Sequence, residues 1–287
     1  MGVTFDYDAM QRLSADIRIE TIRSLAEAGF GHIGGSASIA DVLGALYGGL
    51  MNIDVKNPRW KERDWFVLSK GHCGPALYAA LALKGFFPME WLKTVNKGGT
   101  NLPSHADRLK TPGIDMTTGS LGQGISAAVG IALGNKIQGY DSYTYCIVGD
   151  GELNEGQVWE AAQTANSFKL GHFILFVDWN KKQLDGTIEE INNPLDIAKK
   201  FESFGFSVQT VKGYDVEEIC NAVEIAKQDD ITPSVIILDT IKGIGVSFAE
   251  RVAFNHYLVI DQKMAEEGIA EIEKRYADGT YPGGKLV

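Results

Sequence analysis

Five short runs of mostly apolar residues, separated by longer stretches with helical periodicity, restrict the fold of this sequence more than any other feature. Four runs are uninterrupted and bounded by polar residues, which is typical of strands buried on both faces of a sheet; the fifth alternates only partly. Strands that alternate with helices favour a three-layer α/β fold with a mainly parallel central sheet flanked by helices. The runs are 65–68, 145–148, 173–177, 206–211 and 235–238, and helical stretches include 74–84, 122–138, 155–168, 194–203, 215–227 and 261–276.

The same pattern predicts a single domain over residues 1–287, because no internal repeat, low-complexity segment or linker divides the chain. An amphipathic helix from about Met10 to Leu25 opens the domain, with Gly29 as its stop signal. We expect Ser38 to cap a second helix. After the last strand, from about residue 241, we expect an irregular carboxy-terminal extension.

Composition and charge exclude several classes of protein. The net charge of −10 leaves no basic surplus to neutralise nucleic-acid phosphates. No apolar run approaches the ~20 residues that span a bilayer, and the first ten residues lack the pattern of a secretory signal. The three cysteines (Cys73, Cys146 and Cys220) lie far apart, as expected for reduced thiols. We therefore expect a cytoplasmic protein that binds neither nucleic acid nor membranes.

Polar motifs follow three of the predicted strands. Ser-Lys-Gly-His occupies 69–72, Gly-Asp-Gly occupies 149–151 and Asp-Trp-Asn occupies 178–180. Ligands of open parallel sheets bind outside the carboxyl ends of the strands, so we expect these motifs to meet at one site.

Within these motifs, Asp150 and Asn180 offer two oxygen ligands on neighbouring strand ends. Magnesium prefers a few protein oxygens together with phosphate oxygens and water. The flanking glycines, Gly149 and Gly151, leave room for a ligand to approach the backbone. The pair therefore suits a metal-bridged diphosphate.

The pairing of GDG with WN at 179–180 resembles the signature of thiamine-diphosphate enzymes, which usually ends in NN. Several segments along the chain resemble the amino-terminal half of transketolases, most closely of those encoded as two separate chains. In chain order they are GHIGGSAS (31–38), SKGH (69–72), TPGIDMTTGSLGQGIS (111–126), GDGELNEGQVWEAA (149–162), DWNKKQLDG (178–186) and KGIGVSF (242–248).

This resemblance implies that the chain binds thiamine diphosphate with Mg²⁺, or with Ca²⁺ or Mn²⁺ in its place. The implied metal ligands are the side chains of Asp150 and Asn180 and the backbone carbonyl of Lys182. Glycines at 122 and 124 would allow close approach of the cofactor's rings, or serve tight helix packing instead. The implied cofactor-binding residues are His72, Gly119, Ser120, Leu121, Asp150, Gly151, Glu152, Asn180, Lys242 and His256.

Four of the five histidines lie in or beside these segments, and the resemblance assigns them catalytic roles. Imidazole titrates near neutrality, so it can transfer protons and donate hydrogen bonds to diphosphate or sugar hydroxyls. Tyr257 stands where the family keeps glycine, which adds bulk near the sugar channel, and Ser104 and Ala106 depart from the family's loop. The fifth histidine, His172, is expected to be structural. The four catalytic candidates are His32, His72, His105 and His256.

By the same resemblance, a glutamate on a second αβ domain activates the cofactor. Residues 240–287 are too few for such a domain, which needs ~100–150 residues. We therefore expect a partner chain, the carboxy-terminal half of a split transketolase, in a dimer of heterodimers. Glu155 and Glu160 would lie at the interface with the partner's activating carboxylate, unless they form an exposed helical face.

The expected reaction transfers a two-carbon ketol unit from a ketose, phosphorylated in the ordinary case, to an aldose. Alternatives are a fragment related to 1-deoxy-xylulose-phosphate synthase, the alpha chain of a 2-oxo-acid dehydrogenase, and a non-catalytic regulatory paralogue that binds a partner but no cofactor. An NAD-binding fold is disfavoured because no G-x-G-x-x-G segment follows a strand with an acidic residue beyond it.

Overall fold

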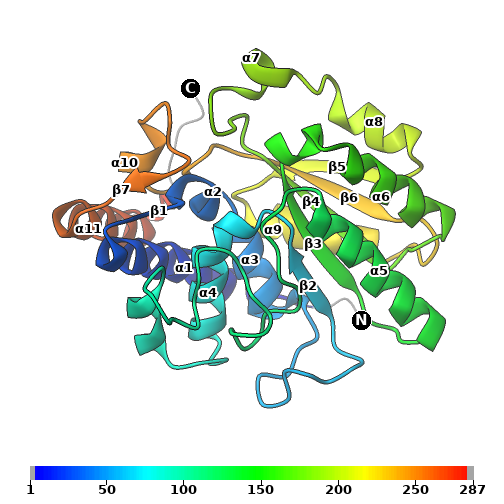
Figure 1. The fold of residues 1–287 in the computed structure, drawn as a ribbon, viewed down its shortest axis with the longest axis horizontal. Helices are drawn as coiled ribbons and strands as arrows, with labels where there is room; N and C mark the ends of the chain where they lie inside the picture. Colours follow the sequence, from blue (N-terminus) through cyan, green and yellow to red (C-terminus); the bar gives the residue numbers. More distant parts are fainter. Residues whose placement is uncertain (1–3, 283–287) are drawn as a thin grey trace.

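The computed structural model describes residues 4–282 and contains a five-stranded, fully parallel sheet in the order β2-β3-β4-β6-β5 (Figure 1). The predicted three-layer α/β class is confirmed, with helices on both faces of this sheet. The strands are β2 (Trp65–Leu68), β3 (Thr144–Gly149), β4 (Phe173–Trp179), β5 (Ser207–Lys212) and β6 (Ser234–Asp239).

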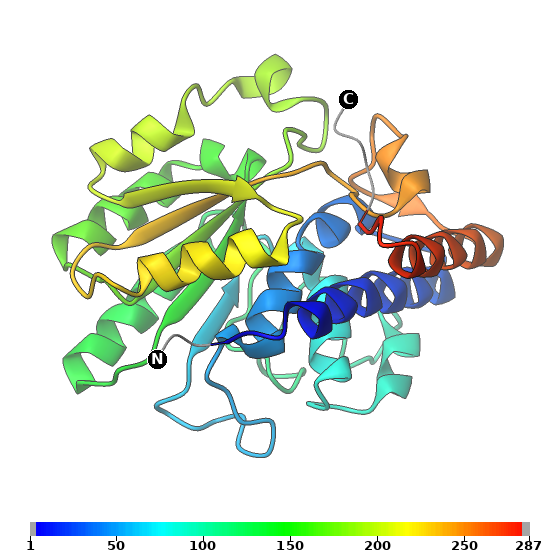
Figure 2. The same ribbon diagram turned by 180° about the vertical axis from the view of Figure 1, so that it is seen from behind.

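Alternate residues of each strand face opposite sides, so the sheet separates two apolar cores. Phe176, for example, packs into the core beneath the first helices, whereas Leu175 packs into the other core. The first core is covered by α1 (Tyr7–Ala28), α3 (Ala40–Ala45), α4 (Gly74–Leu83) and α9 (Val216–Ala226); the second is covered by α5 (Gln123–Gln138), α6 (Gly156–Ser167) and α8 (Ile197–Ser203) (Figures 1 and 2).

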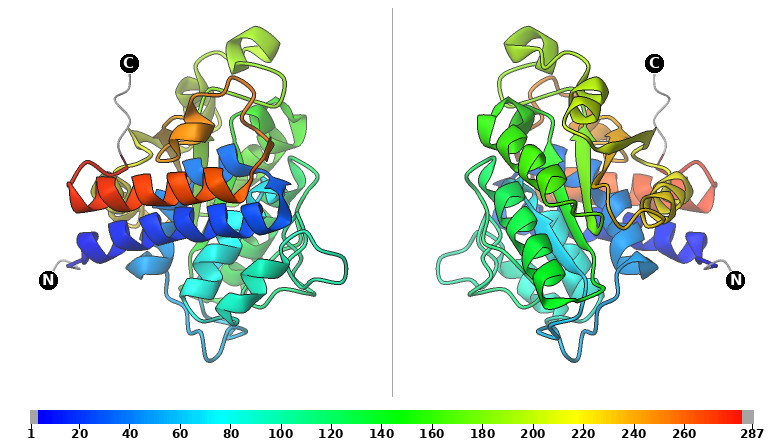
Figure 3. Two further views of the ribbon diagram at one scale, coloured as in Figure 1. Left: turned by 90° about the vertical axis from the view of Figure 1, so that its left-hand side faces the viewer. Right: turned by 90° about the vertical axis from the view of Figure 1, so that its right-hand side faces the viewer.

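The carboxy-terminal extension is more regular than expected. It packs α11 (Gln262–Ala277) alongside α1 (Figure 3). It also brings β7 (Leu258–Val259) into antiparallel pairing with β1 (Phe30–Gly31), forming a separate two-stranded ribbon. The remaining α-helices of the described residues are α2 (Ile33–Ser38), α7 (Ile188–Asn192) and α10 (Ser247–Glu250).

Local signals place the first helix correctly and the second wrongly. Asp6 caps the start of α1, and Gly29 ends the helix in the left-handed region at φ 85°. The prediction that Ser38 caps a helix is wrong, because Ser38 is the last residue of α2 and Ile39 precedes α3. The Ser38 hydroxyl instead donates to Asp178 Oδ2, 2.7 Å away, and so ties α2 to the end of β4.

No helix within residues 4–282 is both long and apolar enough to cross a membrane. The three cysteines lie within the same described part of the chain, where each is buried and unpaired.

Candidate active site

The three predicted motifs meet at the carboxyl edge of the sheet, because β2, β3 and β4 are neighbours and run in parallel. A cavity of about 250 Å³ opens there, and Lys242 and His256 from the segment after β6 also line it. Its walls include His32, Gly35, Lys70, His72, His105, Gly119, Leu121, Gly149, Asp150, Gly151, Glu152, Asn180, Lys182, Gln183, Leu184, Lys242 and His256.

Asp150 lies directly after β3 and is 2% exposed. Its two carboxylate oxygens accept hydrogen bonds from the backbone amides of Gly151 (2.8 Å) and Lys181 (2.5 Å). Burial, followed by the nearby carboxylate of Asp178, raises the pKa of Asp150 well above its usual range. A cation placed against this carboxylate would offset both effects.

Asn180 is held so that its amide oxygen is available as a ligand. Its Nδ2 donates to Asp178 Oδ2 at 2.7 Å, which turns Oδ1 toward the Lys182 amide, 3.2 Å away. Asp178 is itself fixed by a buried ion pair with Lys70, so the orientation of Asn180 depends on a polar network beneath the cavity.

The residues around Asp150 fit a divalent cation that bridges to a diphosphate. A carboxylate, an amide oxygen and the Lys182 carbonyl form the hard oxygen set that Mg²⁺ accepts. Lys242 Nζ donates to the Lys182 carbonyl at 3.0 Å and lies 3.1 Å from His256 Nδ1. Burial lowers the pKa of Lys242, and an anion beside the ammonium would offset this effect.

Gly151 is needed where the GDG turn meets the segment after β4. A Cβ at this position would stand 3.0 Å from Gln183 Cβ, so any larger side chain would push the two loops apart. The close approach of Gly151 to Gln183 keeps Asp150 and the 180–183 segment close together.

The other three candidate histidines surround His32. Its ring centroid lies 5.4 Å from His72, 5.8 Å from His105 and 5.3 Å from His256. The rings of His72 and His256 are 4.7 Å apart. Segments that are separated by more than two hundred residues in the sequence therefore present imidazoles to one cavity.

The histidine cluster favours neutral imidazoles. Burial, together with His105 and Lys242, lowers the pKa of His32 to about 4, and burial with Lys242 lowers the pKa of His256 to about 3. Burial also lowers the pKa values of His72 and His105. At neutral pH each ring can therefore donate one hydrogen bond and accept another.

These pKa values predict that the cofactor-free chain loses stability in mild acid. An unfolded histidine titrates near 6.5, so below that pH the unfolded chain binds more protons than the folded one. Each of the two residues should add a slope of up to ~1.4 kcal/mol per pH unit between pH ~6.5 and ~4. Urea denaturation of the wild type and of the double variant His32→Asn/His256→Asn at several pH values checks this prediction. The free energy of unfolding should fall less steeply with decreasing pH in the double variant, and equal slopes would contradict the prediction.

The loop before α5 meets the cavity through Gly119 and Leu121, whereas Ser120 is exposed and outside its walls. Glu152 fixes this loop: its Oε1 accepts from the Gly122 amide (2.8 Å) and from Ser69 Oγ (2.5 Å). Both oxygens are engaged, since Oε2 accepts from the Gly149 amide at 3.1 Å.

The expectation that glycines at 122 and 124 admit a ring is not supported by their surroundings. A Cβ on Gly124 would stand 2.6 Å from Ser69 Cα, and one on Gly122 would stand 3.1 Å from Glu155 Cβ. Neither glycine lines the cavity, and both allow close packing between segments. This is the packing alternative that the sequence left open.

Lys70 and Asp178 are important to the site, and the sequence assigned neither a role. Both are buried, and Lys70 Nζ also donates to the Gly35 carbonyl at 3.0 Å. The signal that could have identified them is their position in the sequence. A lysine and an aspartate directly after buried strands are expected to be shielded from solvent, and buried charges need partners of opposite charge.

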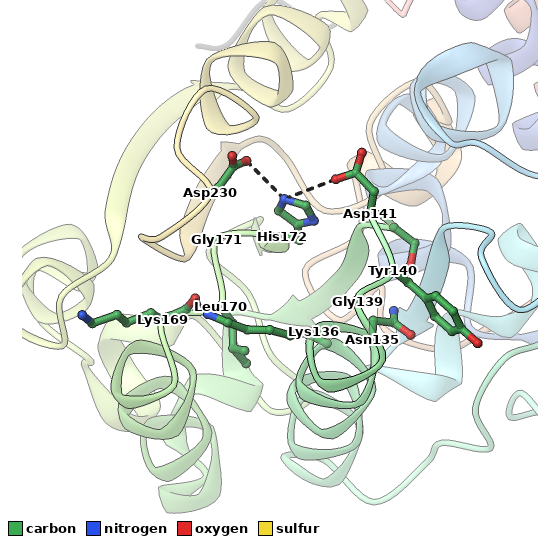
Figure 4. Close-up of a pocket in the computed structure, with 12 residues that line it drawn as sticks. Asn135, Lys136, Gly139, Tyr140, Asp141, Lys169, Leu170, Gly171, His172 and Asp230 are labelled. Carbon is green, nitrogen blue, oxygen red and sulfur yellow. Dashed lines mark hydrogen bonds and ion pairs between the residues drawn. The ribbon is translucent and has the colours of Figure 1, made fainter.

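A second pocket, of about 230 Å³, lies at the opposite edge, where β3 and β4 begin (Figure 4). There His172 points between two aspartates, with Nε2 3.2 Å from Asp230 Oδ1 and 4.0 Å from Asp141 Oδ1. Its ring also stacks on Tyr143 at 4.4 Å. None of the motif residues lines this pocket, so it is separate from the candidate active site.

A parallel α/β sheet with a diphosphate-type site at its carboxyl edge is the architecture of a cofactor-binding domain, and comparison with known proteins supports this class. Residues 9–277 match the family described as the thiamine diphosphate binding domain of transketolase. The chain belongs to this family, and it is one subunit of a thiamine-diphosphate-dependent transketolase.

The chain is similar both to separate transketolase subunits and to one part of single-chain transketolases. A Clostridium protein named 6-deoxy-6-sulfo-D-fructose transketolase subunit SqwG is 51% identical over 93% of this chain and 98% of its own length. One of the subunits of the apulose-4-phosphate transketolase of Phocaeicola vulgatus is 35% identical over 93% of this chain and 95% of its own length. The solved transketolase of Leishmania mexicana superposes with a TM-score of 0.86 at 30% identity, over 96% of this chain and 42% of its own. The chain thus spans less than half of the single-chain transketolases.

Proposed function

We propose that this chain, together with a partner that forms the carboxy-terminal half of the transketolase, transfers a two-carbon ketol unit from a ketose to an aldose. The observation that supports it most directly is the convergence of Asp150, Asn180 and four histidines on one cavity at the carboxyl edge of the sheet. Thiamine diphosphate, when bound, supplies the carbon nucleophile and electron sink that neither imidazole nor carboxylate provides.

The proposed anchor consists of Asp150, Asn180 and the Lys182 carbonyl as ligands of Mg²⁺, with Lys242 and His256 beside the diphosphate. Lys242 and His256 already contact each other, so an anion that accepts from both would restore the charge that burial disfavours on Lys242. Gly119, Leu121 and Gly151 leave room for the cofactor. Glu152 and Asp178 position these groups through hydrogen bonds to the Gly122 amide and the Asn180 side chain.

The proposed proton-handling groups are His32, His72 and His105. Each is held neutral, so its ring can accept a proton from a sugar hydroxyl and return it to an aldehyde oxygen. His105 is the most exposed of the three and lies next to Gly119. This position suits contact with the end of the ketose that is transferred.

The donor is proposed to be a ketose with an anionic terminal group. At 51% identity, the relative named for 6-deoxy-6-sulfo-D-fructose makes a terminal sulfonate the first candidate. The relatives named for apulose-4-phosphate, at 35% and 37%, make a terminal phosphate the second.

The partner is proposed to cover the mouth of the cavity. Glu155 and Glu160 are exposed on α6 and at its start, and Glu155 lies against the Gly122 turn. Two large apolar side chains are also exposed: Leu184 in the cavity wall (58%) and Phe254, two residues before His256 (65%). We propose that the two glutamates reach the partner's activating carboxylate.

Reconstitution tests the proposed function. The purified chain and the carboxy-terminal transketolase half from the same genome are assayed with thiamine diphosphate, Mg²⁺, a three-carbon aldose phosphate and either 6-deoxy-6-sulfofructose or fructose 6-phosphate. We expect ketol transfer only when both chains are present, with the higher kcat/KM for the sulfonate. Turnover by this chain alone, or consumption of pyruvate in place of a ketose, would reject the proposal.

A further inference from the structure

An aromatic pair stands beside the histidine cluster, on the ribbon formed by β1 and β7. The ribbon pairs Phe30 with Val259 and Gly31 with Leu258, so this register continues to His32 opposite Tyr257 and leaves Phe30 diagonal to Tyr257. The rings of Phe30 and Tyr257 stack with centroids 5.6 Å apart and an interplanar angle of 27°. Stacking of this kind is a favourable geometry for two aromatic side chains.

Tyr257 also contacts the cluster itself. Its ring meets His32 edge-to-face, with centroids 5.1 Å apart and planes at 80°. No room remains between these two rings for a ligand. The Tyr257 ring is therefore flanked by two rings, His32 on one side and Phe30 on the other.

The loop that carries Tyr257 is firmly anchored. Asn255 is 1% exposed, and its Nδ2 donates to the carbonyls of Lys242 (2.8 Å) and Ala249 (2.9 Å). A Cβ on Gly34 would stand 2.3 Å from the Asn255 carbonyl, so the loop lies directly on α2. The anchored loop places His256 in the cavity wall and leaves Tyr257, 45% exposed, against His32 in the same wall.

We propose that Phe30 and Tyr257 form a rigid aromatic wall at the cavity mouth and that Tyr257 determines how bulky a ketose the site admits. The inference rests on the proposed function and refines its substrate class. A ketose that reaches the histidines passes beside Tyr257, because this ring covers one side of His32 and is itself 45% exposed. Substrates must then approach along the side lined by His105, Leu121 and Leu184.

Removing the ring should widen this entrance. In Tyr257→Gly, the kcat/KM for a seven-carbon ketose phosphate should rise relative to that for a five-carbon one by roughly tenfold or more, the scale on which pockets discriminate one or two carbons. Tyr257→Phe keeps the ring and should leave the ratio within about twofold. Val259→Ala alters the same ribbon at an exposed side chain and is the matched control, with an unchanged ratio.

A titration that needs no partner tests the wall separately. The His32 ring is followed by NMR against pH in this chain alone, with the wild type, Tyr257→Gly and Tyr257→Phe, and folding is checked by circular dichroism. If Tyr257 shields His32, its pKa should rise toward 6.5 in Tyr257→Gly and stay low in Tyr257→Phe.

The two measurements separate the possible failures. An unchanged His32 pKa in folded Tyr257→Gly would show that Tyr257 does not shield His32, and would contradict the proposed wall. An unchanged ratio of kcat/KM for the two ketose phosphates would contradict its role in specificity. A shifted pKa with no ketol transfer by the wild-type pair would reject the proposed function, and with it the specificity role, while leaving the shielding contact established.

Discussion

Replacing Asp150 with alanine will abolish the magnesium-dependent binding of thiamine diphosphate by this chain. The carboxylate is the one negatively charged ligand in the proposed oxygen set, and Mg²⁺ depends on such charge. Loss of a supporting group alone lowers metal affinity by ~10–100-fold, so removal of a direct ligand should cost roughly 100-fold or more. Titration calorimetry with thiamine diphosphate, with and without Mg²⁺, measures the effect.

The matched control is Asp185→Ala, which removes an exposed carboxylate from the loop after β4 without touching the cavity. Its affinity should equal that of the wild type. Retention of wild-type affinity by Asp150→Ala would show that other groups hold the cofactor and would contradict the proposed role of Asp150 as a metal ligand.

Replacing Arg18 with methionine will destabilise the chain by ~3–5 kcal/mol, because it leaves a buried carboxylate without its cation. Arg18 is 1% exposed, pairs with Asp41 on α3, and donates through Nε to the Ile244 carbonyl at 2.9 Å. It also contacts the hydroxyl of Tyr281. One guanidinium thus joins the first helix, the core and the carboxy-terminal extension, and its loss should loosen all three.

Arg12→Met is the comparison, since it removes the same charge from an earlier turn of the same helix. Arg12 pairs with Asp16 and Glu273 at the surface, where such pairs contribute ~1 kcal/mol or less. Urea denaturation should separate the two variants by a few kcal/mol. Equal losses would show that the buried pair contributes no more than the exposed one.

Much of the fold was predictable because four of the five strands of the sheet, all but the edge strand β5, are mostly buried and carry an uninterrupted apolar run. The end of β4 was not: the strand continues through Asp178 and Trp179, which pair with Leu238 and Asp239 of β6. Polar residues at a strand end give no apolar signal. The ribbon of β1 and β7 was missed for a related reason, since two residues are too few to show a period.

The side chains of the site were predictable where chemistry requires a particular residue type, as for Asp150, Asn180 and the histidines. The supporting network was not. Ser38 fits the preference for helix caps, yet its hydroxyl is used by Asp178, 140 residues away. Lys70 likewise finds Asp178 at a separation of 108 residues. Such pairings follow from tertiary packing, and local sequence carries no signal of them.

The most direct test of the central claim is a crystal structure of the chain with thiamine diphosphate and Mn²⁺, with the ion located by its anomalous scattering. We expect a single ion bound by an Asp150 carboxylate oxygen, Asn180 Oδ1, the Lys182 carbonyl and diphosphate oxygens, at roughly 2.0–2.3 Å from each. An ion or diphosphate bound elsewhere, with Asp150 and Asn180 outside its coordination sphere, would contradict the account.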